Sequence, residues 1–183
     1  MSPLRVFGVT GWKNAGKTTL VERLVAEFVR RGWRVSTIKH AHHDVDVDQP
    51  GRDSYRHRAA GASEVAVVGG LRYAIMREQA EATLAEVLER LAPADLVLIE
   101  GYKREAHPKI EVRAGQVPSL TAEDPNIVAI ASDTRPSEAH LPWFRRDDIV
   151  AMADFIASRF VLRRQAFHGI GNPAACQPEP VIG

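Results

Sequence analysis

The residues best suited to chemistry lie near the start of the chain, where Gly-Trp-Lys-Asn-Ala-Gly-Lys-Thr fits the spacing G-x-x-x-x-G-K-[ST]. Glycines allow such a loop to curl so that successive backbone N–H groups point inward at phosphate oxygens. Lys17 would contact the β- and γ-phosphates of a nucleotide, and the Thr18 hydroxyl would ligate Mg²⁺. The predicted nucleotide-binding residues of this loop are Gly11, Trp12, Lys13, Asn14, Ala15, Gly16, Lys17, Thr18 and Thr19.

A carboxylate that suits this loop follows the apolar run Leu96–Ile99, where Glu100 precedes Gly101. A phosphate loop works with an acid at the end of a neighbouring strand, which holds Mg²⁺ directly or through water. Glutamate departs from the usual aspartate, and the alternative is a strand that ends in a solvated acid. Gly101 would offer its N–H to the γ-phosphate. We therefore assign Lys17 and Glu100 as catalytic, and Thr18 and Glu100 as metal ligands.

The identity of the base is less well defined, because the sequence lacks the Asn/Thr-Lys-x-Asp string that is common in guanine-binding proteins. Asp133 follows the apolar segment 126–132, where a base-reading loop often lies. Its carboxylate could pair with the ring N–H and amino group of guanine, an edge that adenine lacks. Alternatively, Asp133 caps a turn before Pro136. Guanine and adenine both stay open on these residues alone.

Histidines and aspartates are concentrated in residues 40–57. Asp44, Asp46 and Asp48 alternate, so they would face the same way in an extended segment. We expect a loop near the γ-phosphate whose acids approach Mg²⁺, with Asp44 as a metal ligand. A transition-metal site and a solvated polar loop are the alternatives, since the spacing matches no familiar metal motif. Four of the seven histidines lie here: His40, His42, His43 and His57.

Basic residues follow this stretch. Arg52 and Arg56 are four positions apart on a predicted short helix, so they would share a face that suits an anionic ligand such as a phosphate. The alternative is a solvated helix face that pairs with nearby acids. Further cations that could join the same patch are Lys103, Arg104 and Lys109.

Alternating strands and helices would position these residues. β-branched and apolar runs predict strands at 4–11, 33–40, 94–102, 108–113 and 126–132, and a hairpin within 64–78 joined at Gly69-Gly70. Helical spacing of apolar residues predicts helices at 17–32, 53–62, 78–93 and 145–160. This alternation is typical of an α/β three-layer fold of the P-loop NTPase type, with a mostly parallel sheet plus a β-hairpin. We expect a nucleotide-binding domain at 1–160 and a loosely ordered tail at 161–183.

Composition limits the remaining classes. The 183 residues carry a net charge of +1, which argues against a dedicated nucleic-acid binder. The single cysteine, Cys176, cannot form an internal disulfide. The start of the chain lacks the pattern of a signal peptide, and its apolar runs are too short for a membrane helix. We expect a cytoplasmic protein with no nucleic-acid or membrane partner.

Four segments together resemble the family of molybdopterin-guanine dinucleotide biosynthesis protein B, MobB. They are GWKNAGKTTL, TIKHAHHDVDVDQPGRDSYRHRAAGA, DLVLIEGYKREAHPKIEVR and IVAIASD, and the similarity runs in order over residues 4–160. The resemblance implies a GTP-binding homodimer with weak GTPase activity that uses Mg²⁺. It would assist the attachment of GMP to molybdopterin, a possible second ligand, by a nucleotidyltransferase of the MobA type.

Other functions remain open on the sequence. One is a small-molecule kinase of the same fold, although we see no segment long enough for an arginine-rich lid. Another is a metal-insertion GTPase whose histidine-rich loop carries a metal ion. The last is a binding module whose phosphate loop holds phosphate without catalysis.

Overall fold

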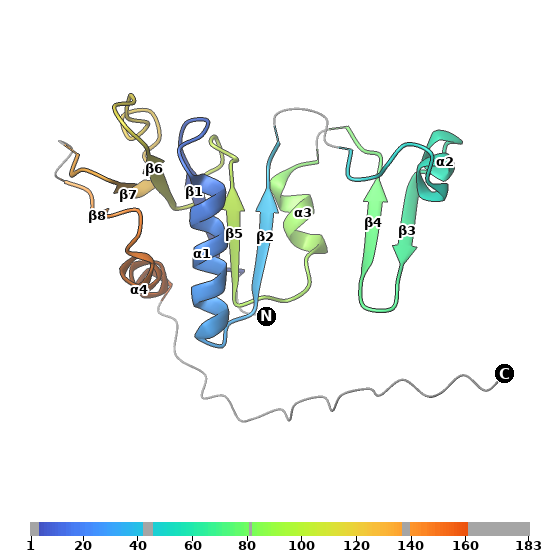
Figure 1. Ribbon diagram of the computed structural model, residues 1–183, viewed down its shortest axis with the longest axis horizontal. Coiled ribbons are helices and arrows are strands. Elements are labelled where there is room, and N and C mark those ends of the chain that lie inside the picture. Colours follow the sequence, from blue (N-terminus) through green and yellow to red (C-terminus); the bar gives the residue numbers. More distant parts are fainter. Residues whose placement is uncertain (1–3, 42–45, 81, 137–139, 161–183) are drawn as a thin grey trace.

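Six strands of the described chain pair side by side in one parallel sheet (Figure 1). They are β1 Val6–Thr10, β2 Val35–Lys39, β5 Leu96–Glu100, β6 Lys109–Arg113, β7 Ile127–Ser132 and β8 Trp143–Phe144. Their order is β2-β5-β1-β6-β7-β8, and every neighbouring pair is parallel. The predicted α/β fold is therefore confirmed. β8 is the one strand of this sheet that the sequence did not predict, since two residues are too few to show a period.

The computed structural model describes residues 4–41, 46–80, 82–136 and 140–160. The predicted tail at 161–183 lies outside this part of the chain. Asp44, the predicted additional metal ligand, lies outside it as well. None of the helices in the described ranges is long and apolar enough to cross a membrane.

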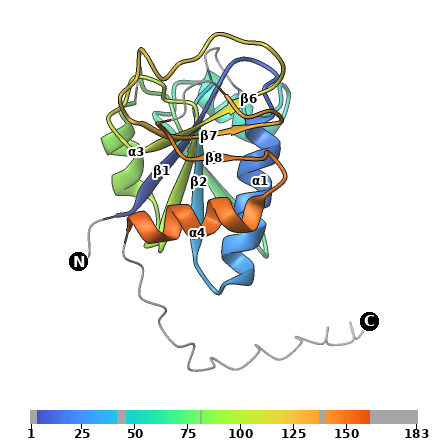
Figure 2. The same ribbon diagram turned by 90° about the vertical axis from the view of Figure 1, so that its left-hand side faces the viewer.

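Helices cover both faces of the sheet. On one face α1 (Lys17–Arg30) packs beside α4 (Ile149–Arg159), as Figure 2 shows. On the other face α3 (Leu84–Arg90) contributes Leu84 to a smaller apolar cluster. The side chains of β5 alternate between these two layers: Leu96 and Leu98 join the larger core, while Val97 and Ile99 join the smaller one. Burial on both faces explains why this strand reads as a continuous apolar run.

Two helices begin later than their apolar spacing predicted. α3 begins at Leu84 rather than at 78, because Thr83 caps it in a box with Glu86, in which each side chain accepts from the other's backbone N–H. α4 begins at Ile149 rather than at 145, and the Asp148 side chain accepts from Ala151 N at 3.3 Å. In both cases a local capping residue sets the start of the helix.

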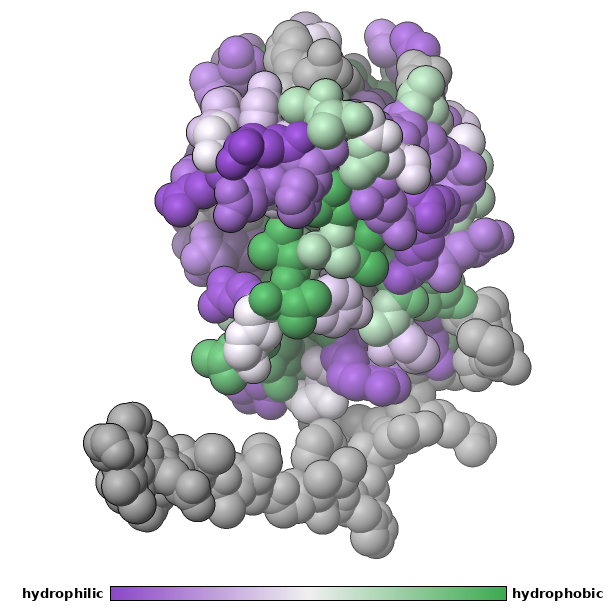
Figure 3. Space-filling view, turned by 90° about the vertical axis from the view of Figure 1, so that its right-hand side faces the viewer, coloured by the Kyte–Doolittle hydropathy of each residue, from purple (hydrophilic) through white to green (hydrophobic). Residues whose placement is uncertain are grey.

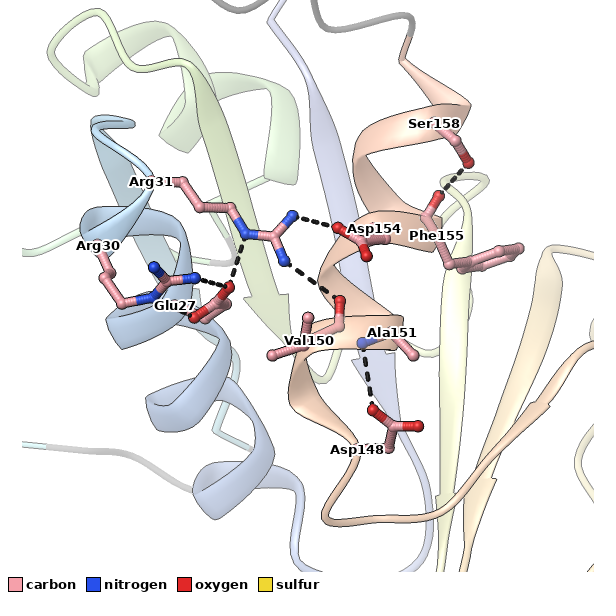
Figure 4. A network of polar contacts seen from close by, with 9 residues as sticks. All are labelled: Glu27, Arg30, Arg31, Asp148, Val150, Ala151, Asp154, Phe155 and Ser158. Carbon is pink, nitrogen blue, oxygen red and sulfur yellow. Dashed lines mark hydrogen bonds and ion pairs between the residues drawn. The ribbon is translucent and has the colours of Figure 1, made fainter.

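An ion-pair network joins α1 to α4 (Figure 4). Glu27, which is only 9% exposed, accepts hydrogen bonds from Arg30 and Arg31 at 2.7–2.8 Å. Arg31 in turn donates to Asp154 Oδ1 at 2.6 Å and to the Val150 carbonyl at 3.2 Å. The hydrogen bonds from Arg30 and Arg31 lower the pKa of Glu27 to about 2. This carboxylate is therefore ionised at any pH near neutrality.

A separate two-stranded antiparallel sheet lies at the opposite end of the molecule from α4, as Figure 1 shows. β3 (Glu64–Val68) and β4 (Tyr73–Arg77) form the predicted hairpin, and Gly69 N donates to Arg72 O across its turn. α2 (Asp53–Ala59) packs against β3, where Val65 is buried. Four apolar or aromatic side chains on the opposite face of the hairpin are exposed: Ala66, Val68, Tyr73 and Ile75. Figure 3 shows hydrophobic surface on this side of the molecule.

Candidate functional site

The glycine-rich loop, residues 11–18, connects β1 to the start of α1 and takes backbone conformations that suit glycine. Gly11 and Gly16 have φ values of 145° and 94°, and Asn14 has a φ of 63°. A Cβ atom on Gly11 would lie 2.4 Å from the Val112 carbonyl oxygen of β6. A side chain at position 11 would therefore collide with the neighbouring strand, which explains the first glycine of the motif.

Lys17 turns back across this loop. Its Nζ atom donates to the Trp12 carbonyl at 2.8 Å, so the ammonium group spans the loop from its end to its beginning. Burial lowers the pKa of Lys17, Glu100 opposes this effect, and Lys103 and Lys39 reinforce it. The positive charges of Lys17, Lys39 and Lys103 repel one another beside the loop. A bound anion would offset this repulsion, so the cluster favours an anionic ligand.

Thr18 and Glu100 meet although 82 positions separate them in the chain. The Thr18 hydroxyl donates to Glu100 Oε1 at 2.8 Å. The parallel pairing of β1 with β5 places Val9 opposite Glu100, so the acid lies at the edge of the sheet from which the glycine-rich loop departs. A hydroxyl and a carboxylate at this distance are the oxygen ligands that Mg²⁺ prefers. These two residues fit the predicted metal site.

Gly101 follows Glu100 in a left-handed conformation, with a φ of 98°. A Cβ atom here would lie 3.1 Å from the His40 Cβ atom and 3.2 Å from its carbonyl oxygen, so glycine allows β5 and the end of β2 to approach. The Gly101 N–H, predicted to serve the γ-phosphate, donates to the Val9 carbonyl at 3.2 Å in this structure. The ring of the next residue, Tyr102, lies against that of His40 in a tilted arrangement, with centroids 4.3 Å apart.

Two neighbouring loops hold the Trp12 side chain. Its indole N–H donates to the Pro118 carbonyl at 2.8 Å, and the Lys103 ammonium lies 5.2 Å from the indole ring centroid. Trp12 as a whole residue is 41% exposed. Neither contact could be found from the sequence, because the partners lie in irregular segments that are 91 and 106 positions away.

A cavity of about 290 Å³ opens beside the glycine-rich loop. Asp133, the predicted base reader, lines it together with Thr19 and Gly16. Both oxygens of Asp133 accept hydrogen bonds from Arg146 at 2.7 Å. The sequence did not mark Arg146, because it lies at the start of a segment predicted as helix, where an arginine is ordinary. Further residues that line this cavity are Arg23, Arg145 and Asp147.

The acidic stretch after β2 is organised by an arginine of α2. Arg58 donates to both oxygens of Asp46 at 2.8–2.9 Å and to Glu78 at 2.8 Å. Asp48 accepts from Ser54 at 2.9 Å and lies 3.5 Å from Arg58. Asp46 and Asp48 therefore hold this segment against α2. Within residues 4–41, 46–80, 82–136 and 140–160, no three His, Cys, Asp or Glu side chains are grouped as metal ligands; His42 and His43 lie outside these ranges.

Lys109 does not join the predicted basic patch. Lys109, expected to join it, is fully buried, and its Nζ atom donates to Asp124 at 2.7 Å and to the carbonyls of Lys103 and Glu105. This expectation was wrong, because a lysine at a strand start can serve the interior when carbonyls and an acid surround its ammonium. Lys109 therefore fixes the segment that follows Glu100.

Comparison with known proteins extends this description. The profile of the MobB family, described as molybdopterin guanine dinucleotide synthesis protein B, matches residues 6–133. The molybdopterin-guanine dinucleotide biosynthesis adapter protein of Escherichia coli is 38% identical over 164 residues, 85% of this chain and 92% of that protein. Its Haemophilus influenzae namesake is 37% identical over 155 residues, 82% of this chain and 86% of that protein. The crystal structure of Bacillus subtilis MobB matches with a TM-score of 0.70 at 29% identity, covering 85% of this chain and 98% of that chain.

Proposed function

The chain belongs to the MobB family, and from this premise we propose that it is a GTP-binding adapter protein in the biosynthesis of molybdopterin guanine dinucleotide. It would hold GTP with Mg²⁺ and assist a partner nucleotidyltransferase that attaches GMP to molybdopterin. The extent of the match supports this role, since relatives named as adapter proteins align over more than four-fifths of the chain.

The observation that carries the nucleotide part of the proposal is the Thr18–Glu100 hydrogen bond at the mouth of the glycine-rich loop. Thr18 and Glu100 would hold Mg²⁺, and Lys17 would contact the β- and γ-phosphates. The bound metal ion would supply charge neutralisation at the phosphates. Weak GTPase activity is the expected chemistry of this set, because slow turnover suits a site that a partner protein completes.

The cavity next to the loop supports the choice of a nucleotide over free phosphate. It adjoins Gly16 and Thr19, so a ligand whose phosphates lie in the loop can extend into it. Asp133 in its wall carries the carboxylate that a guanine base would require. A phosphate-only module has no use for such a cavity.

Two partners belong to the proposal. The first is a guanylyltransferase of the MobA type, with molybdopterin as the second ligand of the complex. The second is another copy of this chain. The exposed apolar face of the hairpin supports a homodimer, because Val68 is 78% exposed, Tyr73 71% and Ile75 57%. Apolar side chains gathered in this way on a hairpin are typical of a protein–protein contact.

The proposal is tested by titrating the full-length chain with GTP, ATP and molybdopterin in the presence of Mg²⁺. We expect GTP to bind more tightly than ATP, and Lys17→Ala to abolish GTP binding with little change in thermal stability. Arg77→Ala, which removes a cation from the separate hairpin, serves as the matched control. GTP affinity that is equal in the wild type and in Lys17→Ala would refute the nucleotide site.

The same material separates the competing functions. Preference for ATP, together with transfer of its γ-phosphate to a small acceptor, would favour the kinase. Stoichiometric Zn²⁺ or Ni²⁺ binding that is lost when His40, His42 and His43 become alanine would favour the metal-insertion GTPase. Equal affinity for all nucleotides and for inorganic phosphate would favour the phosphate-binding module.

A further inference from the structure

Arg146 bridges the two walls of the cavity beside the glycine-rich loop. Its Nε and Nη2 atoms donate to Asp133 Oδ1 and Oδ2, both at 2.7 Å. Its Nη1 atom donates to the Ala15 carbonyl at 3.3 Å. The guanidinium group thus donates to both oxygens of the Asp133 carboxylate and is also hydrogen-bonded to the glycine-rich loop.

A guanine base would need that same edge. Guanine presents a ring N–H and an exocyclic amino group side by side, so it resembles the guanidinium group as a fork of two donors. A carboxylate accepts two parallel hydrogen bonds from such a fork. Adenine presents an amino group next to an unprotonated ring nitrogen, so it cannot replace both hydrogen bonds of Arg146.

We propose that Arg146 holds the base-reading carboxylate of Asp133 when no nucleotide is bound, and that a guanine base displaces Arg146 from it. This inference rests on the proposed function, in which the phosphates of GTP lie in the glycine-rich loop. The exchange is feasible because the pair is open to water: the Asp133 side chain is 57% exposed and that of Arg146 35%. Exposed ion pairs are weak and exchange partners readily.

Arg145 provides a matched control in the same cavity wall. It is the preceding residue, it carries the same charge, and its Nε atom lies 3.3 Å from Asp147 Oδ1. Removing Arg145 therefore removes an equal charge from the cavity without removing the competitor for Asp133. Any effect that arises only from the charge of the cavity would be the same for both arginines.

The test is a calorimetric titration of the full-length chain with GDP and with ADP, in Mg²⁺. We expect Arg146→Ala to bind GDP roughly two- to fivefold more tightly, because this is the change in affinity that corresponds to the loss of one exposed ion pair. The affinity of Arg146→Ala for ADP should equal that of the wild type. Arg145→Ala should change both affinities by the same factor. Asp133→Asn should lose GDP affinity by about tenfold and gain affinity for xanthosine diphosphate, whose ring carbonyl accepts from the new amide.

A second measurement is made on the wild-type chain, so its result does not depend on whether a variant folds. In a nitrogen-labelled wild-type chain, the Nε–H signal of Arg146, assigned with Arg146→Lys, should shift when GDP is added and stay in place with ADP. The inference is overturned if GDP leaves this signal unmoved, or if Arg146→Ala leaves GDP binding unchanged or weakens GDP and ADP alike. Absence of binding of either nucleotide to the wild type would instead overturn the proposed function itself, and the inference with it.

Discussion

The ion-pair network between α1 and α4 leads to a quantitative prediction for Glu27→Gln. Glutamine keeps the shape of the side chain and one acceptor oxygen, so the substitution removes mainly the charge that Arg30 and Arg31 share. A pKa of about 2 in place of 4.5 corresponds to roughly 3 kcal/mol of unfolding free energy. Because the Arg30 side chain is 68% exposed, water weakens its part, and we expect a loss of about 2 kcal/mol at pH 7.

The pH dependence gives this prediction its sign. The pKa of Glu27 is lower in the folded chain than in the unfolded chain, so its contribution is present above pH 4.5 and is lost as the pH falls towards 2. The difference in stability between wild type and Glu27→Gln should therefore be constant from pH 7 to 5 and shrink steadily below pH 4.5. Both chains contain every other carboxylate, so the difference between their stabilities reports the titration of Glu27 alone.

Urea unfolding followed by circular dichroism, at pH 7, 5, 4 and 3, measures this difference. Asp154→Asn is the control, since its carboxylate binds Arg31 but is 66% exposed and should cost less than about 1 kcal/mol. A stability difference that does not change between pH 7 and 3 would refute the role of the Glu27 charge. So would a loss at pH 7 no greater than that of the control.

Three further predictions concern the site and the hairpin. Gly11→Ala should lower stability by about 1–3 kcal/mol and abolish GTP binding, because its Cβ atom meets the Val112 carbonyl; unchanged melting temperature and affinity would contradict this. Glu100→Gln should slow Mg²⁺-dependent GTP hydrolysis more than it weakens binding in a single-turnover assay, and an equal rate would mean that Glu100 is structural. If the chain forms the proposed dimer through the hairpin, Ile75→Glu should give a monomer in sedimentation velocity, whereas Val150→Glu, at an exposed apolar residue of α4, should not; a dimer that survives Ile75→Glu would exclude the hairpin face.

The sequence predicted where the glycine-rich loop and the acid beside it would lie, because both signals are local. The spacing of Gly11, Gly16 and Lys17 is enough to predict a curled loop before a helix. The apolar run before Glu100 indicates a strand that is buried on both faces. The meeting of Thr18 with Glu100 could be expected because parallel strands end at one edge of a sheet. These are the parts of the site in which chain order alone fixes the arrangement.

Contacts between irregular segments were beyond such reasoning. Nothing in the sequence indicates that Arg146 would reach Asp133, or that Pro118 would accept from Trp12. Lys109 was misjudged for the same reason, since its burial depends on carbonyls of a loop that has no periodic pattern. Side chains of this kind are placed by the packing of several loops at once, which single-segment patterns do not contain.

Because Trp12 lies in the glycine-rich loop, its fluorescence can report on changes in that loop. An indole that lies 5.2 Å from an ammonium group and donates to a carbonyl has an emission that depends on both neighbours. Trp33, by contrast, is partly buried and stacks on the core residue Phe28 with ring centroids 4.6 Å apart. The intrinsic fluorescence of the unlabelled chain therefore carries a component that follows the loop itself, distinct from one that follows the integrity of the fold.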